Sequence, residues 1–244
     1  MRDEEGKYLI DKHTILSSPS IQVLDLTQKR KTRLTGTTGE PLIVGNPEMP
    51  LISLVPGEEP DHQLEPLPGS EIEAKAIAQM QGVQPLIGKE ATETTVVEKM
   101  PQAKLIHFAT HGLLDGYQGN IPGLIAFTKD GKNDGLLNAV DIYNMKLQAD
   151  LVVLSACNTG LGEITSDGVI GLSRAFFNAG VPSLLVSLWN LPDNSTAPLM
   201  TEFYKNLQTT PDKAQALRQA MLTRKEVDPD PVNWAGFMLL GQAE

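Results

Sequence analysis

Cysteine is almost absent from this sequence, because Cys157 is the single example among 244 residues. One thiol excludes an intrachain disulfide framework, and the segment from Met1 to Gly6 offers no apolar signal region. We therefore expect a reducing, cytoplasmic setting. A lone cysteine is often a small buried hydrophobic residue, so its place in the sequence has to decide whether it is reactive.

Basic residues are also scarce. The chain has 20 Lys and Arg against 30 Asp and Glu, which gives a formal net charge of −10. This excess of negative charge disfavours direct binding to nucleic acid or to an anionic membrane, and mildly favours basic partners. The uncharged stretch 175–192 is interrupted by Gly180 and Pro182, so it predicts a helix end followed by a buried strand and not a membrane span.

Motifs that hold metals, phosphates or a serine nucleophile are missing. No CxxC or HExxH pattern accompanies His107, His111 and Cys157, which disfavours a zinc site. The run 160–162 lacks the other residues of a dinucleotide or Walker loop, and Ser155 lacks a GxSxG elbow. We expect neither a metal nor a cofactor.

What the sequence does contain is an alternation of expected strands and helices. Apolar runs such as 151–154 and 184–188 show little alternation, which is typical of parallel strands covered on both faces. The pattern predicts an α/β fold, a three-layer αβα sandwich with a mostly parallel central sheet. Expected strands are 41–46, 104–108, 150–156, 181–188 and 234–240, and expected helices are 92–100, 138–145, 168–179, 194–207 and 211–224.

The chain divides into a lead-in, residues 1–40, and a main domain, residues 41–244. The lead-in has apolar residues between 8 and 26 that predict a strand and a short helix, and a basic, Gly- and Thr-rich stretch that predicts an exposed linker. Six prolines between 47 and 68 predict a surface loop without ladder pairing. A helix is then expected to begin with Ser70 as its cap and Glu73 completing a capping box.

Two reactive side chains are expected at one edge of the sheet. Cys157 closes the apolar run 151–154 and precedes the turn residues Asn158-Thr159-Gly160, whereas His111 follows the expected strand 104–108. Ligands of open parallel sheets bind beyond the carboxyl ends of the strands, where both residues fall. A thiol needs a nearby base to become a nucleophile, and His111 is the candidate. The backbone N–H groups of Gly112 and Cys157 are candidate oxyanion donors.

These residues resemble a known family. The order of His111-Gly112 and Ala156-Cys157 is similar to the caspase-like cysteine peptidases, which include caspases, gingipains and separases, and their separation is near the ~50 residues typical of caspases. The longer strings resemble the CHAT domain, a caspase-related module often attached to tetratricopeptide repeats in bacteria. They are HFATHG (107–112), LSACNTG (154–160), AGVP (179–182), SLW (187–189), LPGSE (67–71) and WAGF (234–237).

The resemblance implies a caspase-like sheet with Cys157 as nucleophile and His111 as base and later acid. His107 does not match the dyad and is interpreted as a core histidine. The arginines that bind aspartate in caspases are not visible, and the acids Glu163, Asp167 and Asp193 stand there instead, which suits an Arg or Lys side chain of a substrate. The alternative is that Asp167 and Asp193 cap the helices that follow them.

Two functional hypotheses follow from the resemblance. The first is a cysteine endopeptidase that cleaves a protein or peptide substrate after a basic residue and is regulated by an attached or partner sensor module, such as a tetratricopeptide-repeat region. The second is a catalytically silent CHAT-like scaffold that acts by binding. Because both residues of the dyad are present, the first hypothesis is favoured.

Overall fold

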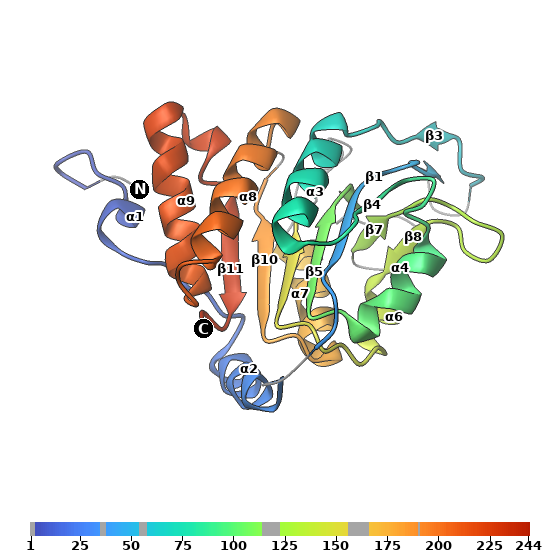
Figure 1. Ribbon diagram of the computed structural model, residues 1–244, viewed down its shortest axis with the longest axis horizontal. Helices are drawn as coiled ribbons and strands as arrows, with labels where there is room; N and C mark the ends of the chain where they lie inside the picture. The colour runs from blue at the N-terminus through green and yellow to red at the C-terminus, as the bar shows by residue number, and fades with distance from the viewer. Residues whose placement is uncertain (1–2, 35–37, 54–57, 114–122, 156–165, 190) are drawn as a thin grey trace.

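The computed structural model describes residues 3–34, 38–53, 58–113, 123–155, 166–189 and 191–244; for 31–34, 166–170 and 193–194 only the backbone is described. Its centre is a six-stranded sheet in the order β11-β10-β9-β5-β1-β4. The neighbours from β10 to β4 pair in parallel, and β11 is antiparallel to β10 (Figure 1). The strands are β1 (Leu42–Pro47), β4 (Leu86–Gly88), β5 (Leu105–Ala109), β9 (Leu151–Leu154), β10 (Ser183–Ser187) and β11 (Phe237–Gly241).

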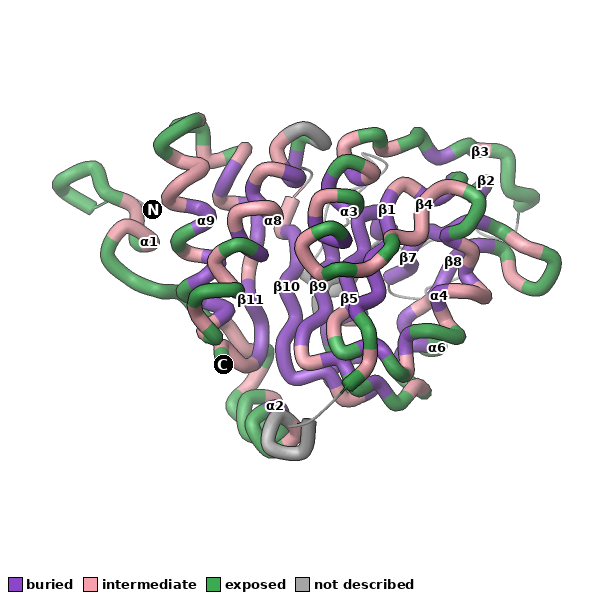
Figure 2. Tube along the Cα trace, viewed as in Figure 1, coloured by how far each residue is buried: buried purple, intermediate pink, exposed green. Residues whose placement is uncertain are grey.

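Helices cover both faces of the sheet, which confirms the predicted three-layer αβα sandwich. Alternate strand residues such as Ile43, Val153 and Leu185 pack against one helical layer, and their neighbours Val44 and Val152 pack against the other. The inner strands β9 and β10 are accordingly buried along their length, whereas the edge strand β4 is half-buried (Figure 2). The first layer is α3 (Pro68–Gln81), α8 (Asp193–Leu207) and α9 (Lys213–Val227), and the second is α4 (Glu93–Lys99), α6 (Ala139–Tyr143) and α7 (Ser166–Ala179).

Two small sheets lie outside the central one, and neither was predicted from the sequence. One consists of β6 (Gly112–Leu113), β7 (Leu124–Ala126) and β8 (Leu136–Asn138), and the other pairs β2 (Leu51–Ile52) with β3 (His62–Gln63). The prediction that 47–68 lacks ladder pairing was therefore wrong at β2 and β3. Their apolar residues share a third core cluster, which packs the two small sheets together.

Three predicted helix starts also need correction. The helix α3 begins at Pro68 after the N-cap Leu67, so Ser70 and Glu73 lie inside it and form no capping box. Proline suits this first position because the first N–H groups of a helix have no partner within it. Asp167 is the second residue of α7, and Asp193 is the first residue of α8 after the N-cap Pro192, so neither is the N-cap residue of its helix.

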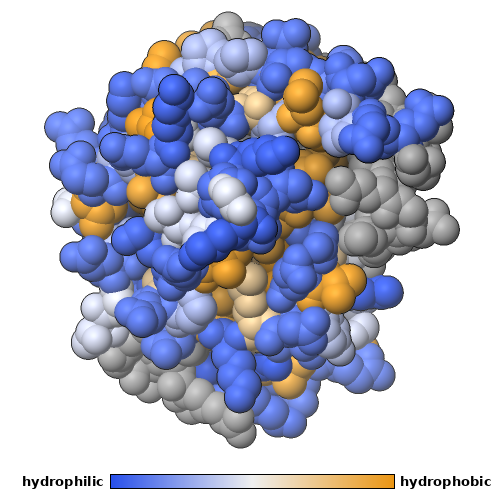
Figure 3. Space-filling model, turned by 90° about the vertical axis from the view of Figure 1, so that its right-hand side faces the viewer, coloured by the Kyte–Doolittle hydropathy of each residue, from blue (hydrophilic) through white to orange (hydrophobic). Residues whose placement is uncertain are grey.

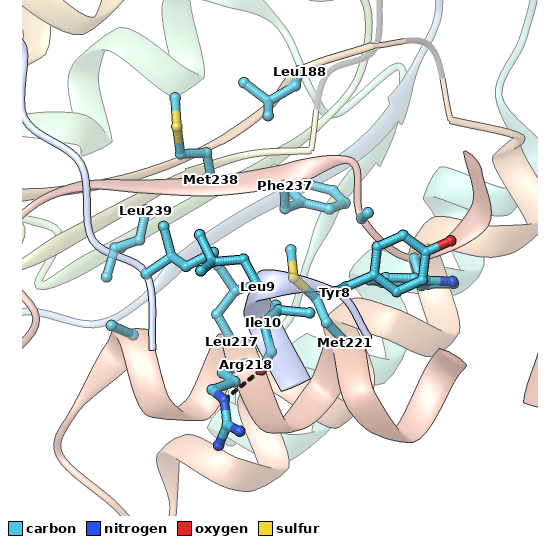
Figure 4. Close-up of a pocket in the computed structure, with 14 residues that line it drawn as sticks. Tyr8, Leu9, Ile10, Leu188, Leu217, Arg218, Met221, Phe237, Met238 and Leu239 are labelled. Atoms are coloured by element: carbon cyan, nitrogen blue, oxygen red, sulfur yellow. Dashed lines mark hydrogen bonds between the residues drawn. The ribbon is translucent and has the colours of Figure 1, made fainter. Parts of the chain in front are cut away.

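The N-terminal segment packs on the edge of the central sheet. It contains α1 (Leu9–Lys12) and α2 (Ile21–Leu34), so the basic run predicted as an exposed linker is helical up to Leu34. Ser17 pairs with β11 at Leu240, and Arg218 of α9 donates to the carbonyl oxygen of Ile10 at 2.7 Å. Between this segment, α9 and β11 lies an apolar pocket of about 240 Å³ (Figure 4). The boundary at residue 40 stays a prediction.

The side of the molecule that carries β3, α4 and β8 is mainly hydrophilic. Apolar side chains appear there between charged and polar ones (Figure 3). In the described part of the chain, no helix combines the length and the apolar character needed to cross a membrane.

The close packing of α3 on β1 generates a test. A Cβ atom on Gly45 would lie 2.4 Å from the Cβ of Ala74 and 2.6 Å from the carbonyl oxygen of Ser70. We expect Gly45→Ala to displace α3 and to lower the free energy of unfolding by about 1–3 kcal/mol, measured by urea denaturation. Gly131→Ala is the control, because a Cβ there meets nothing within 4 Å. Equal midpoints for the two variants would contradict this packing.

Candidate active site

The register of β5 and β9 pairs the two strands that precede the predicted dyad residues in the sequence. Phe108 of β5 is the parallel partner of Leu154 of β9. His111 follows Phe108 by three residues in sequence, and Cys157 follows Leu154 by the same number. Both therefore follow paired strands at the same carboxyl edge of the sheet.

The described residues do not include every predicted site residue. Cys157 and Glu163 lie outside them, so the structure describes neither the thiol nor its distance from the imidazole. For Asp167 and Asp193 the backbone alone is described, at the first turns of α7 and α8. The helix α7 connects the parallel strands β9 and β10, so it runs back along the sheet and its first turn lies toward the carboxyl edge, whereas α8 follows the carboxyl end of β10.

His111 is a buried residue, 5% exposed, whose ring is fixed by a backbone group. Its Nε2 lies 2.7 Å from the carbonyl oxygen of Glu65, in the segment before α3. A carbonyl oxygen can only accept, so Nε2 carries a proton and donates it. The neutral imidazole then has its lone pair on Nδ1, and Nδ1 is the nitrogen that can take a proton.

The segment that supplies the Glu65 carbonyl is held by Asn46 at the end of β1. The Asn46 side-chain oxygen accepts from the Leu67 N–H at 2.8 Å, and its amide nitrogen donates to Glu71 at 3.3 Å. Asn46 has a φ of 43°, a left-handed conformation that asparagine tolerates better than most residues. Asn46 and the Glu65 carbonyl are parts of the candidate site that were not predicted.

The residues on either side of His111 are fixed by β7. The Thr110 hydroxyl donates to the carbonyl oxygen of Ala126 at 2.7 Å, and the Ala126 N–H donates to the carbonyl oxygen of His111 at 2.9 Å. Hydrogen-bonded and non-bonded pairs alternate in antiparallel ladders, so the adjacent pair Gly112–Ile125 is non-bonded. The Gly112 N–H is therefore directed away from β7, an orientation open to an oxyanion role.

His107 lies in the middle of β5, within the core, as the sequence indicated. It is fully buried, with Nδ1 3.2 Å from the Tyr204 hydroxyl and Nε2 3.0 Å from Oε1 of Glu73. Nε2 of His107 and both carboxyl oxygens of Glu73 have no hydrogen-bond partner among the described residues, so this contact is a close approach and not a hydrogen bond. Burial, and then the Glu73 carboxylate, raise the pKa of Tyr204 well above its usual value of 10, so its hydroxyl stays protonated.

No set of three or more His, Cys, Asp and Glu side chains within the described ranges is arranged to hold a metal ion.

The fold defines a class of protein. The separase of Saccharomyces cerevisiae, solved in complex with securin, aligns with 97% of this chain and 14% of its own, at a TM-score of 0.54 and 14% identity. The Arg-specific cysteine proteinase gingipain R aligns with 93% of this chain and 53% of its own, at a TM-score of 0.57 and 12% identity. The central sheet is thus that of the caspase-like fold.

The family follows from the sequence. The model of the CHAT domain matches residues 1–242, and the chain belongs to the CHAT domain family. Tetratricopeptide repeat protein 28 of Homo sapiens is 31% identical over 277 aligned residues, and that of Mus musculus is 30% identical over 276. Each match covers 97% of this chain but only 11% of the relative, so this chain spans about a tenth of their length.

The role of Asn46 can be tested by stability. We expect Asn46→Ala to lower the free energy of unfolding by about 1–3 kcal/mol in urea denaturation, because it removes the acceptor of the Leu67 N–H and leaves alanine in a left-handed conformation. Asn46→Gly removes the hydrogen bonds without the strain and should lose less. Asn144→Ala removes an exposed hydrogen bond to Val140 and should cost about 0.5 kcal/mol or less. A loss for Asn46→Ala no larger than this control would contradict the role.

Proposed function

We propose that this CHAT domain is a cysteine endopeptidase in which His111 activates Cys157. The observation that carries the proposal is the hydrogen bond from His111 Nε2 to the Glu65 carbonyl, which leaves Nδ1 as the proton acceptor beside the carboxyl end of β9. The pairing of Phe108 with Leu154 supports it, because His111 and Cys157 follow these partners at equal sequence distance.

The proposed reaction proceeds through a thioester. Nδ1 of His111 accepts the thiol proton of Cys157, and the thiolate sulfur bonds to the carbonyl carbon of the scissile peptide. The N–H groups of Gly112 and Cys157 stabilise the oxyanion. The imidazolium returns its proton to the leaving amine as the C–N bond breaks. A water molecule, deprotonated by Nδ1, then attacks the thioester, releases the acid product and restores the thiol.

The proposed preference for a basic residue rests on acidic residues in the segments that follow β9 and β10 in the sequence. Asp167 and Asp193 belong to the first turns of α7 and α8, and Glu163 precedes α7 in the sequence. A carboxylate beside the cleavage site would pair with a substrate guanidinium or ammonium group. Gingipain R, an Arg-specific cysteine proteinase, has a similar fold, and its basic preference is consistent with this assignment.

We also propose that a repeat region or partner protein regulates the activity. The relatives are tetratricopeptide repeat proteins, and the match occupies about a tenth of their length, so an attached repeat array is the natural candidate. The separase structure contains securin, a protein partner bound to a chain of the same fold. The chain's net charge of −10 favours a basic substrate or partner surface.

A binding function is the second candidate. It is favoured by the relatives, whose name states a repeat class and no activity. The burial of His111, with 5% of its surface exposed, also fits a side chain that serves the fold. In this case the CHAT domain would be a scaffold that retains both residues of the dyad without using them.

Hydrolysis of short peptides tests the first candidate. We expect the wild-type chain to cleave fluorogenic peptides ending in Arg or Lys, Cys157→Ala to abolish cleavage, and His111→Ala to lower kcat/KM by about 10²–10⁴-fold, because the thiol loses its base. Iodoacetamide should label Cys157 faster in the wild type than in His111→Ala, and mass spectrometry measures this at the single cysteine. His62→Ala, on the edge strand β3, is the matched histidine control.

Failure of both readouts would contradict the peptidase proposal. If neither hydrolysis nor selective labelling occurs, with or without a repeat region attached, the scaffold function is the better explanation. In that case Cys157→Ala should bind its partner with unchanged affinity in a pull-down from a lysate of the source cells.

Charge removal tests the substrate preference. We expect at least one of Asp193→Asn, Asp167→Asn and Glu163→Gln to lower kcat/KM for an Arg peptide by roughly ten- to a hundredfold, the worth of a charge-assisted hydrogen bond, and to leave an uncharged norleucine peptide unaffected. Glu98→Gln, an exposed acid near the far end of α4, is the control. An unchanged Arg-to-norleucine ratio in all three variants would overturn the assignment.

A further inference from the structure

Two histidines, His107 within β5 and His111 two residues beyond its end, contact the same preceding segment of the chain. His111 donates through Nε2 to the carbonyl oxygen of Glu65 at 2.7 Å, and His107 places Nε2 3.0 Å from Oε1 of Glu73. Residues 107–111 and residues 65–73 are therefore joined at both of their ends. The His111–Glu65 contact fixes the tautomer of His111, the proposed base. The His107–Glu73 contact lies at the other end of the two joined segments.

The His107 contact is surrounded by protein on every side. Glu73 and His107 have no exposed surface and Tyr204 has 1%. The Tyr204 hydroxyl lies 3.2 Å from Nδ1 of His107, and the two rings meet edge to face with centroids 5.6 Å apart. The cluster thus connects α3, β5 and α8. Glu65 precedes α3, His111 follows β5, and Asp193 is the first residue of α8.

Packing alone does not require this cluster. The strand partners of His107 are Ile43 and Val153, and the surrounding core is apolar, so a leucine or valine would suit the position. Burying a carboxylate and an imidazole costs free energy that is recovered only in part by their mutual contact. Such clusters serve best where a fixed geometry is needed, because few arrangements place an imidazole next to both a carboxyl group and a phenol.

We propose that His107 is a positioning residue for His111, acting through Glu73 and α3 on the Glu65 carbonyl. The contact at Glu73 fixes α3 relative to β5, and α3 begins three residues after Glu65. When the contact is lost, α3 is free to shift, the Glu65 carbonyl moves away from Nε2, and His111 loses its tautomer preference. The catalytic consequence rests on the proposed function, whereas the effect on the His111 tautomer does not.

Nitrogen NMR of the histidine rings tests the proposal directly. The chain has four histidines, so the Nδ1 and Nε2 signals of His111 can be assigned by comparison with His111→Ala. We expect the wild type to show a protonated Nε2 and a lone pair on Nδ1. In His107→Leu and in Glu73→Gln, the two shifts should move toward a tautomer average, and kcat/KM for an Arg peptide should fall about tenfold. His107→Gln, which keeps a polar amide between Glu73 and Tyr204, should restore part of both.

A matched control separates positioning from a general loss of stability. Ser183→Ala removes another buried side-chain hydrogen bond, from Ser183 to the carbonyl oxygen of Gln242, at the opposite end of the sheet. It should lower the unfolding midpoint without changing the His111 signals. If His107→Leu does not fold, Glu73→Gln decides, since it keeps the shape of the side chain.

The outcomes are distinguishable from those of the proposed function. Unchanged His111 shifts in a folded Glu73→Gln variant would overturn the positioning role, whatever its activity. Shifted His111 signals in a chain that never hydrolyses peptides would support the positioning role and count against the peptidase.

Discussion

The parallel pairing of β5 with β9 is the constraint on which the candidate site depends. Its register sets Phe108 beside Leu154, so the chain leaves the sheet at equivalent points on both strands. A slip of one residue would turn His107 toward the layer of α4, α6 and α7, and would turn Phe108 away from Phe127, with which it makes an edge-to-face contact. Both faces of the sheet have to be covered by apolar side chains, and this requirement fixes the register. The register in turn fixes the point at which the chain continues from β5 to His111.

Beyond the strand ends, the position of His111 is set by backbone groups more than by side chains. The carbonyl of Glu65 holds its ring, and β7 holds its own carbonyl. Asn46 in turn holds the segment that contains Glu65, in a left-handed conformation that few other residues adopt at low cost. The site is consequently sensitive to the placement of α3, which packs on β1 where Gly45 leaves no room for a side chain.

Much of this arrangement was predictable from the sequence, because long apolar runs and helical spacing report on the central sheet and its covering helices. The short strands β6 to β8 were not, since two or three residues contain too little periodicity to identify a strand. The Glu65 carbonyl was not predictable for a different reason: every residue has a carbonyl, and only the fold determines which one meets an imidazole. The C-terminal half of α2 was missed because its basic run was interpreted by charge, although Arg30 donates to the carbonyl oxygens of Phe177 and Asn178.

The burial of His111 bears on the choice between enzyme and scaffold. A buried neutral imidazole bound through Nε2 to a carbonyl carries its proton on Nε2, so its other nitrogen, Nδ1, is the base. A scaffold needs the bulk of this side chain but not its tautomer, so a leucine or phenylalanine would serve at lower cost of desolvation. A fixed tautomer is useful where one defined nitrogen must accept and return a proton, as Nδ1 must between a thiol and a leaving amine. The same reasoning extends to the buried polar side chains of His107 and Glu73, which are not needed for packing but, in the proposal, hold the segment that fixes the tautomer of His111.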